Sequence, residues 1–80
     1  METLNTEIFL KHFAAQFEDT EVSLITLETL FRDLEEWNSL IALSLIAMAD
    51  EEYQVKLTGD DIRASKTVAD IFEVIKLKNA

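Results

Sequence analysis

The chain has 80 residues, a hydrophobic fraction of 49% and a formal net charge of −9 from 16 acidic and 7 basic side chains. This length predicts a single domain over residues 1–80 with a modest core, too small for a large catalytic cleft, so we expect no enzymatic activity. The negative field disfavours nucleic acids and anionic membrane surfaces as partners. It favours proteins that carry basic patches.

Residue types that the sequence lacks or nearly lacks restrict the class further. There is no proline and only one glycine, Gly59, which favours an all-α fold over a sheet with tight hairpins. The absence of cysteine excludes disulfides, thiolate ligands and a cysteine nucleophile. His12 is the single histidine and cannot form a zinc site unaided, so no metal site is expected. The amino terminus has acids at Glu2 and Glu7 and no long apolar run, which argues against a signal peptide or membrane span and for a cytoplasmic protein.

Two segments precede the most apolar part of the chain. Residues 3–17 predict a helix that Thr3 or Asn5 caps, with apolar residues at helical spacing: Leu4, Ile8, Phe9, Phe13 and Phe17. A polar break follows at residues 18–21. Residues 22–36 are apolar without a clean period and predict an ordered connection with a short helical turn near residues 27–31. We expect the apolar side chains of this connection to cover the core.

The second half of the chain predicts three helices. The first runs from Ser39 to about Tyr53, with Asn38 as its N-cap and Trp37 as a hydrophobic staple. A capping box at Thr58 opens a short helix that ends near Ala64. Thr67 opens the last helix, whose inward-facing residues are expected to be Val68, Ile71, Phe72 and Ile75. The expected fold is therefore a small all-α bundle of three longer helices and one short helix.

The order of these parts resembles a known family. The segment FRDLEEWNSLIALSLIAMADEEY at residues 31–53 resembles the serine region of acyl carrier proteins, in which Ser-Leu opens an apolar helix that ends in two acids and an aromatic residue. The tail LTGDDIRASKTVADIFEVI at residues 57–75 resembles their third and fourth helices. The resemblance covers most of the chain beyond residue 30, and the combination is specific although Ser-Leu alone is not.

This resemblance implies a serine esterified by 4′-phosphopantetheine, whose thiol carries acyl groups as thioesters. The matching residue is Ser39, and the bundle core would shelter or release the acyl chain. A phosphopantetheinyl transferase would attach the arm, and acyl-transferring and condensing enzymes with basic surfaces would be the further partners. Fatty acid, polyketide and related syntheses use such carriers, which act as monomers. The other interpretation of Ser39 is a helix-start hydroxyl that only caps.

Two positions depart from the family pattern. The residue before the serine is usually aspartate, and here Asn38 keeps the cap but lacks the charge. If the transferase or its metal ion uses that carboxylate, modification of Ser39 would be slower or absent. The glutamate often found five residues after the serine is replaced by Ser44, which we interpret as a packing or partner-surface residue.

A partner surface is expected next to Ser39. The helix that starts there is apolar nearly all round, so we predict an exposed apolar patch of Leu40, Ile41 and Leu43. We expect an acidic rim around this patch, formed by Asp50, Glu51 and Glu52. Trp37 is a further candidate contact for partners. The alternative is a fully buried core helix.

Two rival functions stay open at this point. The first is an unmodified helical interaction module with a carrier-like fold, which Asn38 favours. The second is an aminoacyl or peptidyl carrier, which shares the arm but differs in cargo. The acids Asp60 and Asp61 lack the ligand spacing of an EF-hand and are expected to be helix-start charges.

Overall fold

The computed structural model describes residues 5–79 and contains four α-helices within them. The helices are α1 (Thr6–Ala14), α2 (Ser39–Tyr53), α3 (Gly59–Ala64) and α4 (Val68–Asn79), and two short 3₁₀ turns lie at Val22–Leu24 and Phe31–Asp33. The described residues form no strand, although one isolated antiparallel bridge joins Leu30 to Thr67. The predicted all-α architecture of three longer helices and one short helix is confirmed.

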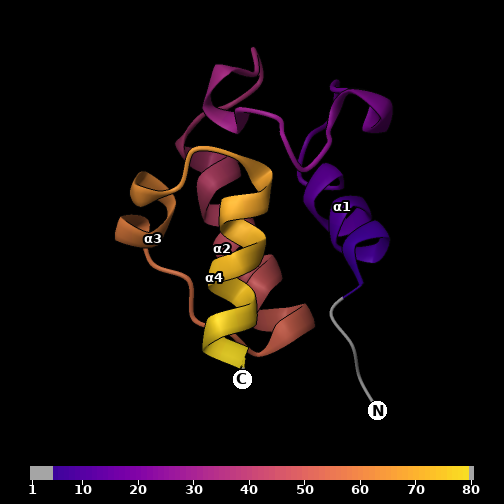
Figure 1. Cartoon of the computed structure of the whole chain (residues 1–80). Helices are drawn as coiled ribbons and strands as arrows, with labels where there is room; N and C mark the ends of the chain where they lie inside the picture. The colour runs from indigo at the N-terminus through magenta and orange to yellow at the C-terminus, as the bar shows by residue number, and fades with distance from the viewer. Residues whose placement is uncertain (1–4, 80) are drawn as a thin grey trace.

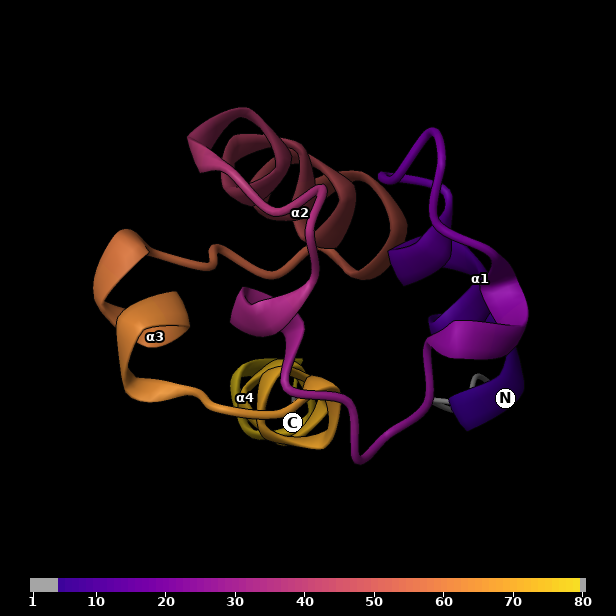
Figure 2. The ribbon, with the colours of Figure 1, turned by 90° about the horizontal axis from the view of Figure 1, so that it is seen from above.

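Helices α2 and α4 form the centre of the bundle. In Figures 1 and 2, α1 and α3 lie on opposite sides of the α2–α4 pair. The connection between α1 and α2 crosses one end of the bundle, at the top of Figure 1, and α2 begins at this end. The start of α2 therefore has the connection on one side and α3 on another.

One hydrophobic core holds these elements together. Its fully buried aromatic residues are Phe9, Phe13 and Phe31, so the connection contributes to the core as directly as α1 does. Phe31 packs edge-to-face on Phe13, with ring centroids 6.2 Å apart. The four residues of α4 that were expected to face inward are all buried: Val68, Ile71, Phe72 and Ile75.

The first helix is shorter than the apolar spacing predicts. It ends at Ala14 instead of residue 17, and the chain tightens there through 3₁₀-type bonds from the N–H groups of Gln16 and Phe17 to the carbonyls of Phe13 and Ala14. Phe17 is buried nonetheless, because the tightened turn still directs it to the core. Asn5 is the cap, accepting from the Ile8 N–H at 3.0 Å. The predicted contributions of Thr3 and Leu4 lie outside the described residues.

The connection departs from its prediction in two ways. One 3₁₀ turn lies before the predicted site at 27–31, and the other begins at its last residue, Phe31, and continues to Asp33. Its apolar residues also do not all cover the core, because Ile25 and Phe31 are buried whereas Val22, Leu24 and Leu30 are more than half or about half exposed. Without a regular period, sequence spacing gives no basis for separating the two groups.

The predicted starts of the three later helices are confirmed. Thr58 and Asp61 form a complete capping box at α3. At α4, the Thr67 hydroxyl accepts from the Asp70 N–H at 3.2 Å, and Asp70 accepts from the N–H of Thr67 at 3.2 Å. These starts were predictable because each depends on residues three positions apart.

Candidate functional site

Ser39 is the first residue of α2, and its side chain is exposed. The preceding Asn38 has an extended backbone, and its Oδ1 accepts a hydrogen bond from the N–H of Ile41 at 3.0 Å. The predicted cap is thereby confirmed. The first turn of a helix leaves further N–H groups without intrahelical acceptors, which favours an anion beside the Ser39 hydroxyl.

Trp37 anchors the approach to Ser39. Its ring packs edge-to-face on Phe31 with centroids 4.9 Å apart, and it lies 6.4 Å from the ring of Phe17. The side chain is half-buried against the core. The predicted staple thus packs on the connection, and it fixes the turn from which Ser39 emerges.

An apolar pocket of about 430 Å³ opens beside Ser39 between α2 and α3. Its lining combines apolar side chains with two cations: Arg32, Trp37, Asn38, Ser39, Ala42, Leu43, Ile46, Gly59, Ile62 and Arg63. This volume lies within the usual range for sites that bind small molecules. A group attached at Ser39 therefore has an apolar hollow within its immediate surroundings.

The exposed apolar patch is confirmed for two of its three predicted residues. Leu40 is 70% exposed and Leu43 is 61% exposed. Ile41 is only 7% exposed, so its predicted place in the patch is wrong. Ile41 belongs to the inward stripe of α2, which continues at helical spacing through Leu45, Met48, Ala49 and Tyr53.

The acidic rim lies about 16 Å from Ser39, because eleven helical steps separate Ser39 from Asp50. Asp50 follows Leu40 and Leu43 at spacings that share one helix face, and Glu51 lies next to it on that side. Glu52 instead approaches α1, with its Oε1 3.7 Å from Nε2 of His12. The exposed face therefore includes two of the three predicted acids.

Glu36 forms a clamp that the sequence analysis missed. Its carboxylate accepts hydrogen bonds from the backbone N–H groups of Glu18, Asp19 and Thr20 at 2.6–3.1 Å, and from the Thr20 hydroxyl at 2.8 Å. Partial desolvation raises the pKa of Glu36, but the Thr20 hydroxyl and these N–H groups outweigh it and hold the pKa below its ordinary value. The clamp joins residues 18–20, which follow the end of α1, to Glu36, which directly precedes Trp37.

A second hollow of about 280 Å³ lies beside Asn38, on the side of the Glu36 clamp. It is more polar in its lining, which consists of Gln16, Glu18, Glu36, Asn38, Leu40, Ile41 and Ser44. Ser44 is half-buried there, in agreement with its interpretation as a packing or surface residue.

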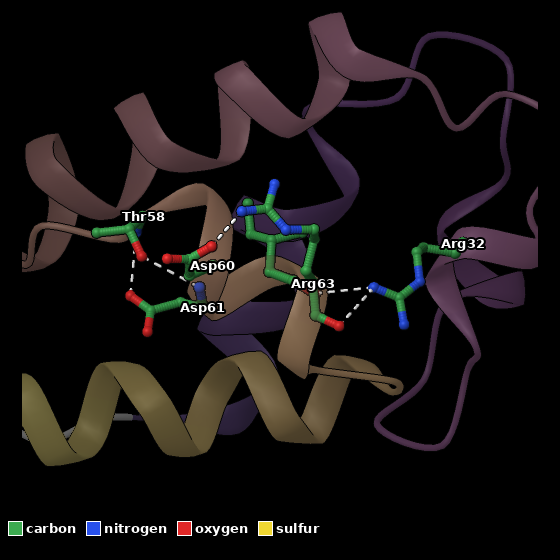
Figure 3. A network of polar contacts seen from close by, with 6 residues as sticks. Arg32, Thr58, Asp60, Asp61 and Arg63 are labelled. Carbon is green, nitrogen blue, oxygen red and sulfur yellow. Dashed lines mark hydrogen bonds and ion pairs between the residues drawn. The ribbon is translucent and has the colours of Figure 1, made fainter.

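Arg32 forms a clamp of opposite charge on the α3 side. Its Nη1 donates to the carbonyl oxygens of Ile62 at 3.0 Å and Arg63 at 3.1 Å, as Figure 3 shows. These carbonyls belong to the last turn of α3, where the Ile62 oxygen also accepts from the N–H of Ser65 at 3.1 Å. Both clamps were invisible in the sequence because in each case a charged side chain binds backbone atoms 16 to 31 residues away.

The helix-start acids have structural partners. Asp61 accepts from Lys78 Nζ at 2.7 Å, and this bond, with those from Thr58, holds the pKa of Asp61 below its ordinary value. Asp60 pairs with Arg63 (Figure 3).

Within residues 5–79, no group of three or more metal-binding side chains is placed to hold an ion. The same residues include no helix long and apolar enough to span a bilayer.

Comparison with known proteins identifies the fold. The solution NMR structure of a holo acyl carrier protein from Geobacter metallireducens matches with a TM-score of 0.72 and 28% sequence identity, over 98% of this chain and 86% of that one. No family model and no curated protein sequence matches.

The helical bundle and this match show that the chain has the fold of an acyl carrier protein and resembles such a protein over nearly its whole length.

Proposed function

We propose that this chain is an acyl carrier protein that holds a 4′-phosphopantetheine arm on Ser39 and delivers acyl groups to enzymes of fatty acid, polyketide or related synthesis. The observation that carries the proposal is the exposed Ser39 hydroxyl at the start of α2, at the position that the family pattern assigns to the modified serine.

The residues around Ser39 fit such an arm. The N-terminal N–H groups of α2 suit a phosphodiester attached at the hydroxyl. The 430 Å³ apolar pocket adjoins the same residue and would receive the arm or the first carbons of its cargo. When bound, the arm supplies a thiol that holds acyl groups as thioesters, which the cysteine-free chain lacks.

The remaining roles follow from the surface. Leu40 and Leu43, with Asp50 and Glu51 further along the helix, form a face that suits enzymes with basic and apolar docking surfaces. Trp37 would act through the position of Ser39, since much of its ring is packed on the core. We further propose that residues 1–80 form one monomeric carrier domain, that the chain works in the cytoplasm, and that its partners perform all the catalysis.

A second candidate is an unmodified interaction module with the same fold. The observation that favours it is Asn38, which keeps the cap geometry but lacks the carboxylate usual before the modified serine. In this case the exposed face of α2 would bind partners without an arm.

Loading by a phosphopantetheinyl transferase separates the two candidates. The protein is incubated with coenzyme A, magnesium and a broad-specificity transferase, and its intact mass is measured. The carrier gains one phosphopantetheine group, and Ser39→Ala gains none. Ser44→Ala is the matched control, because this second serine of α2 is half-buried and should load like the wild type. Absence of loading with several transferases would support the interaction module.

A further inference from the structure

The pocket beside Ser39 has a charge that contrasts with the rest of the molecule. Acids outnumber bases by 16 to 7 in the chain, yet the charged residues that line this pocket are two arginines, Arg32 and Arg63. We propose that the pocket selects acyl cargo with an anionic end, such as the free carboxylate of a dicarboxylic acid held as a half-thioester. This inference rests on the proposed carrier function and specifies its cargo class.

Arg32 is held in place at the edge of the pocket. Its Nη1 bonds to the carbonyls of Ile62 and Arg63, and its guanidinium carbon lies 5.5 Å from the centre of the Phe31 ring. Both hydrogen bonds use one nitrogen, so within the described part of the chain the rest of the five-donor fork stays available to an added acceptor. A guanidinium already fixed by its neighbours loses less freedom when it binds an anion.

Arg63 supplies the second cation from α3. Its guanidinium pairs with Asp60, one turn earlier in the same helix (Figure 3). A Cβ built on Gly59 would lie 3.5 Å from its Nη1, so the guanidinium lies over the first turn of α3. Asp60 offsets part of this charge, and Arg32, whose bonds are to neutral carbonyls, is therefore the stronger of the two cations.

The remaining lining defines the other half of the ligand. The walls are apolar, formed by Trp37, Ala42, Leu43, Ile46 and Ile62. An apolar chain alone would gain burial here but would use neither guanidinium. A chain that ends in a carboxylate gains the same burial together with charge-assisted and potentially bidentate hydrogen bonds.

The anion could come from two sources, the carboxylate of the cargo or the phosphodiester of the arm itself. Three loaded forms distinguish them: the arm alone, the arm with pentanoyl, and the arm with succinyl, which has nearly the same length but a carboxylate end. The transferase attaches each from the matching coenzyme A thioester, and the mass verifies it. The Arg32 and Arg63 Nε–H resonances and the Trp37 indole resonance then report occupation of the pocket.

We expect succinyl to shift both arginine resonances, and pentanoyl or the arm alone to leave them nearly unchanged. The shift should shrink in 0.5 M salt, because the arginines are exposed. Arg63→Gln should lower the ratio of bound to free succinyl, read from Trp37, by about two- to five-fold, the size expected for an exposed charge pair. Lys66→Gln is the matched control, since it removes an exposed cation that does not line the pocket, and it should leave the ratio unchanged.

Other outcomes overturn the inference. Equal responses to succinyl and pentanoyl, or equal effects of Arg63→Gln and Lys66→Gln, would show that the pocket does not select an anionic end. Arginine shifts with the arm alone would assign the cations to the phosphodiester and refute cargo selection. Failure to load, seen in the mass before any resonance is recorded, refutes the carrier function itself; loading without discrimination refutes this inference alone.

Discussion

The connection between α1 and α2 and the helix α2 are both rich in apolar residues, but they keep their shapes by different means. Helix α2 closes its backbone hydrogen bonds internally, so its side chains divide between a buried stripe and an exposed face. The connection has no such internal ladder. Its position depends on the Glu36 clamp, the Arg32 clamp and backbone bonds to the start of α4, from Val68 to Thr29 and from Ala69 to Leu27.

This difference has a consequence for Ser39. The helix supplies the exposed hydroxyl, whereas the irregular segment before it sets the direction from which the helix starts. Substitutions of the buried or clamping side chains of the connection should therefore disturb the fold, and substitutions on the exposed face of α2 should not.

The largest effect is expected at Phe31, which is completely buried although it lies in the connection. Phe31→Ala should lower the free energy of unfolding by about 3–5 kcal/mol, because it leaves a cavity among Phe13, Trp37 and their neighbours. The neighbouring Leu30 is half exposed and serves as the control, and Leu30→Ala should change the free energy of unfolding by less than about 0.5 kcal/mol. Urea denaturation measures both variants. Equal losses in free energy of unfolding would show that the connection is not part of the core.

The next effect tests the two faces of α2. Ile41→Ala should cost about 2–5 kcal/mol because Ile41 belongs to the buried stripe. Leu43→Ala, on the exposed face, should change the free energy of unfolding by less than about 0.5 kcal/mol. Chemical denaturation of both variants measures the contrast. A large loss in Leu43→Ala would mean that this face is not free for partners.

Acidification tests the Glu36 clamp. Because the folded-state pKa of Glu36 lies below the ordinary value of 4.5, its contribution is complete above that value and is lost as the pH falls through the lowered pKa. Glu36→Gln should thus lower the melting temperature at neutral pH and reduce the fall of stability in acid. Asp61 and Asp70 also have lowered pKa values, so part of the fall remains.

Glu35→Gln is the matched control for the clamp, because Glu35 is the exposed neighbour of Glu36. It should leave the melting temperature and its pH dependence close to those of the wild type. Identical profiles for the two variants would refute the clamp.

The smallest effect on stability is expected at Asn38. Asn38→Asp keeps an N-cap oxygen for the Ile41 N–H and adds a negative charge at the positive end of the helix dipole, so it should stabilise by about 0.3–1 kcal/mol. If the transferase uses the charge, the same variant should load faster, which the rate of mass gain measures. Equal loading rates would show that asparagine here is harmless.

The sequence was sufficient to predict the parts of the fold that depend on local spacing. The caps at Asn38, Thr58 and Thr67 involve residues three positions apart, and the starts of α2, α3 and α4 were correct for this reason. The end of α1 was wrong because tightening of its last turn keeps Phe17 buried beyond the helix, so the apolar spacing continues past Ala14.

The surroundings of Ser39 were less predictable. Helical spacing could have assigned Ile41 to the buried stripe, since Leu45 and Met48 continue it. No such signal exists for Glu36 or Arg32, because their partners are backbone atoms of distant segments, which every residue type provides. The pocket between α2 and α3 likewise depends on how two helices pack.

The most direct test of the central claim is the location of the arm on the loaded protein. Fragmentation of the intact chain in a mass spectrometer assigns the added group to a single residue. The carrier function predicts that every fragment with the added mass contains Ser39, and that fragments without Ser39 are unmodified. An added group on Ser44 or another residue, or none after treatment with active transferases, would contradict it.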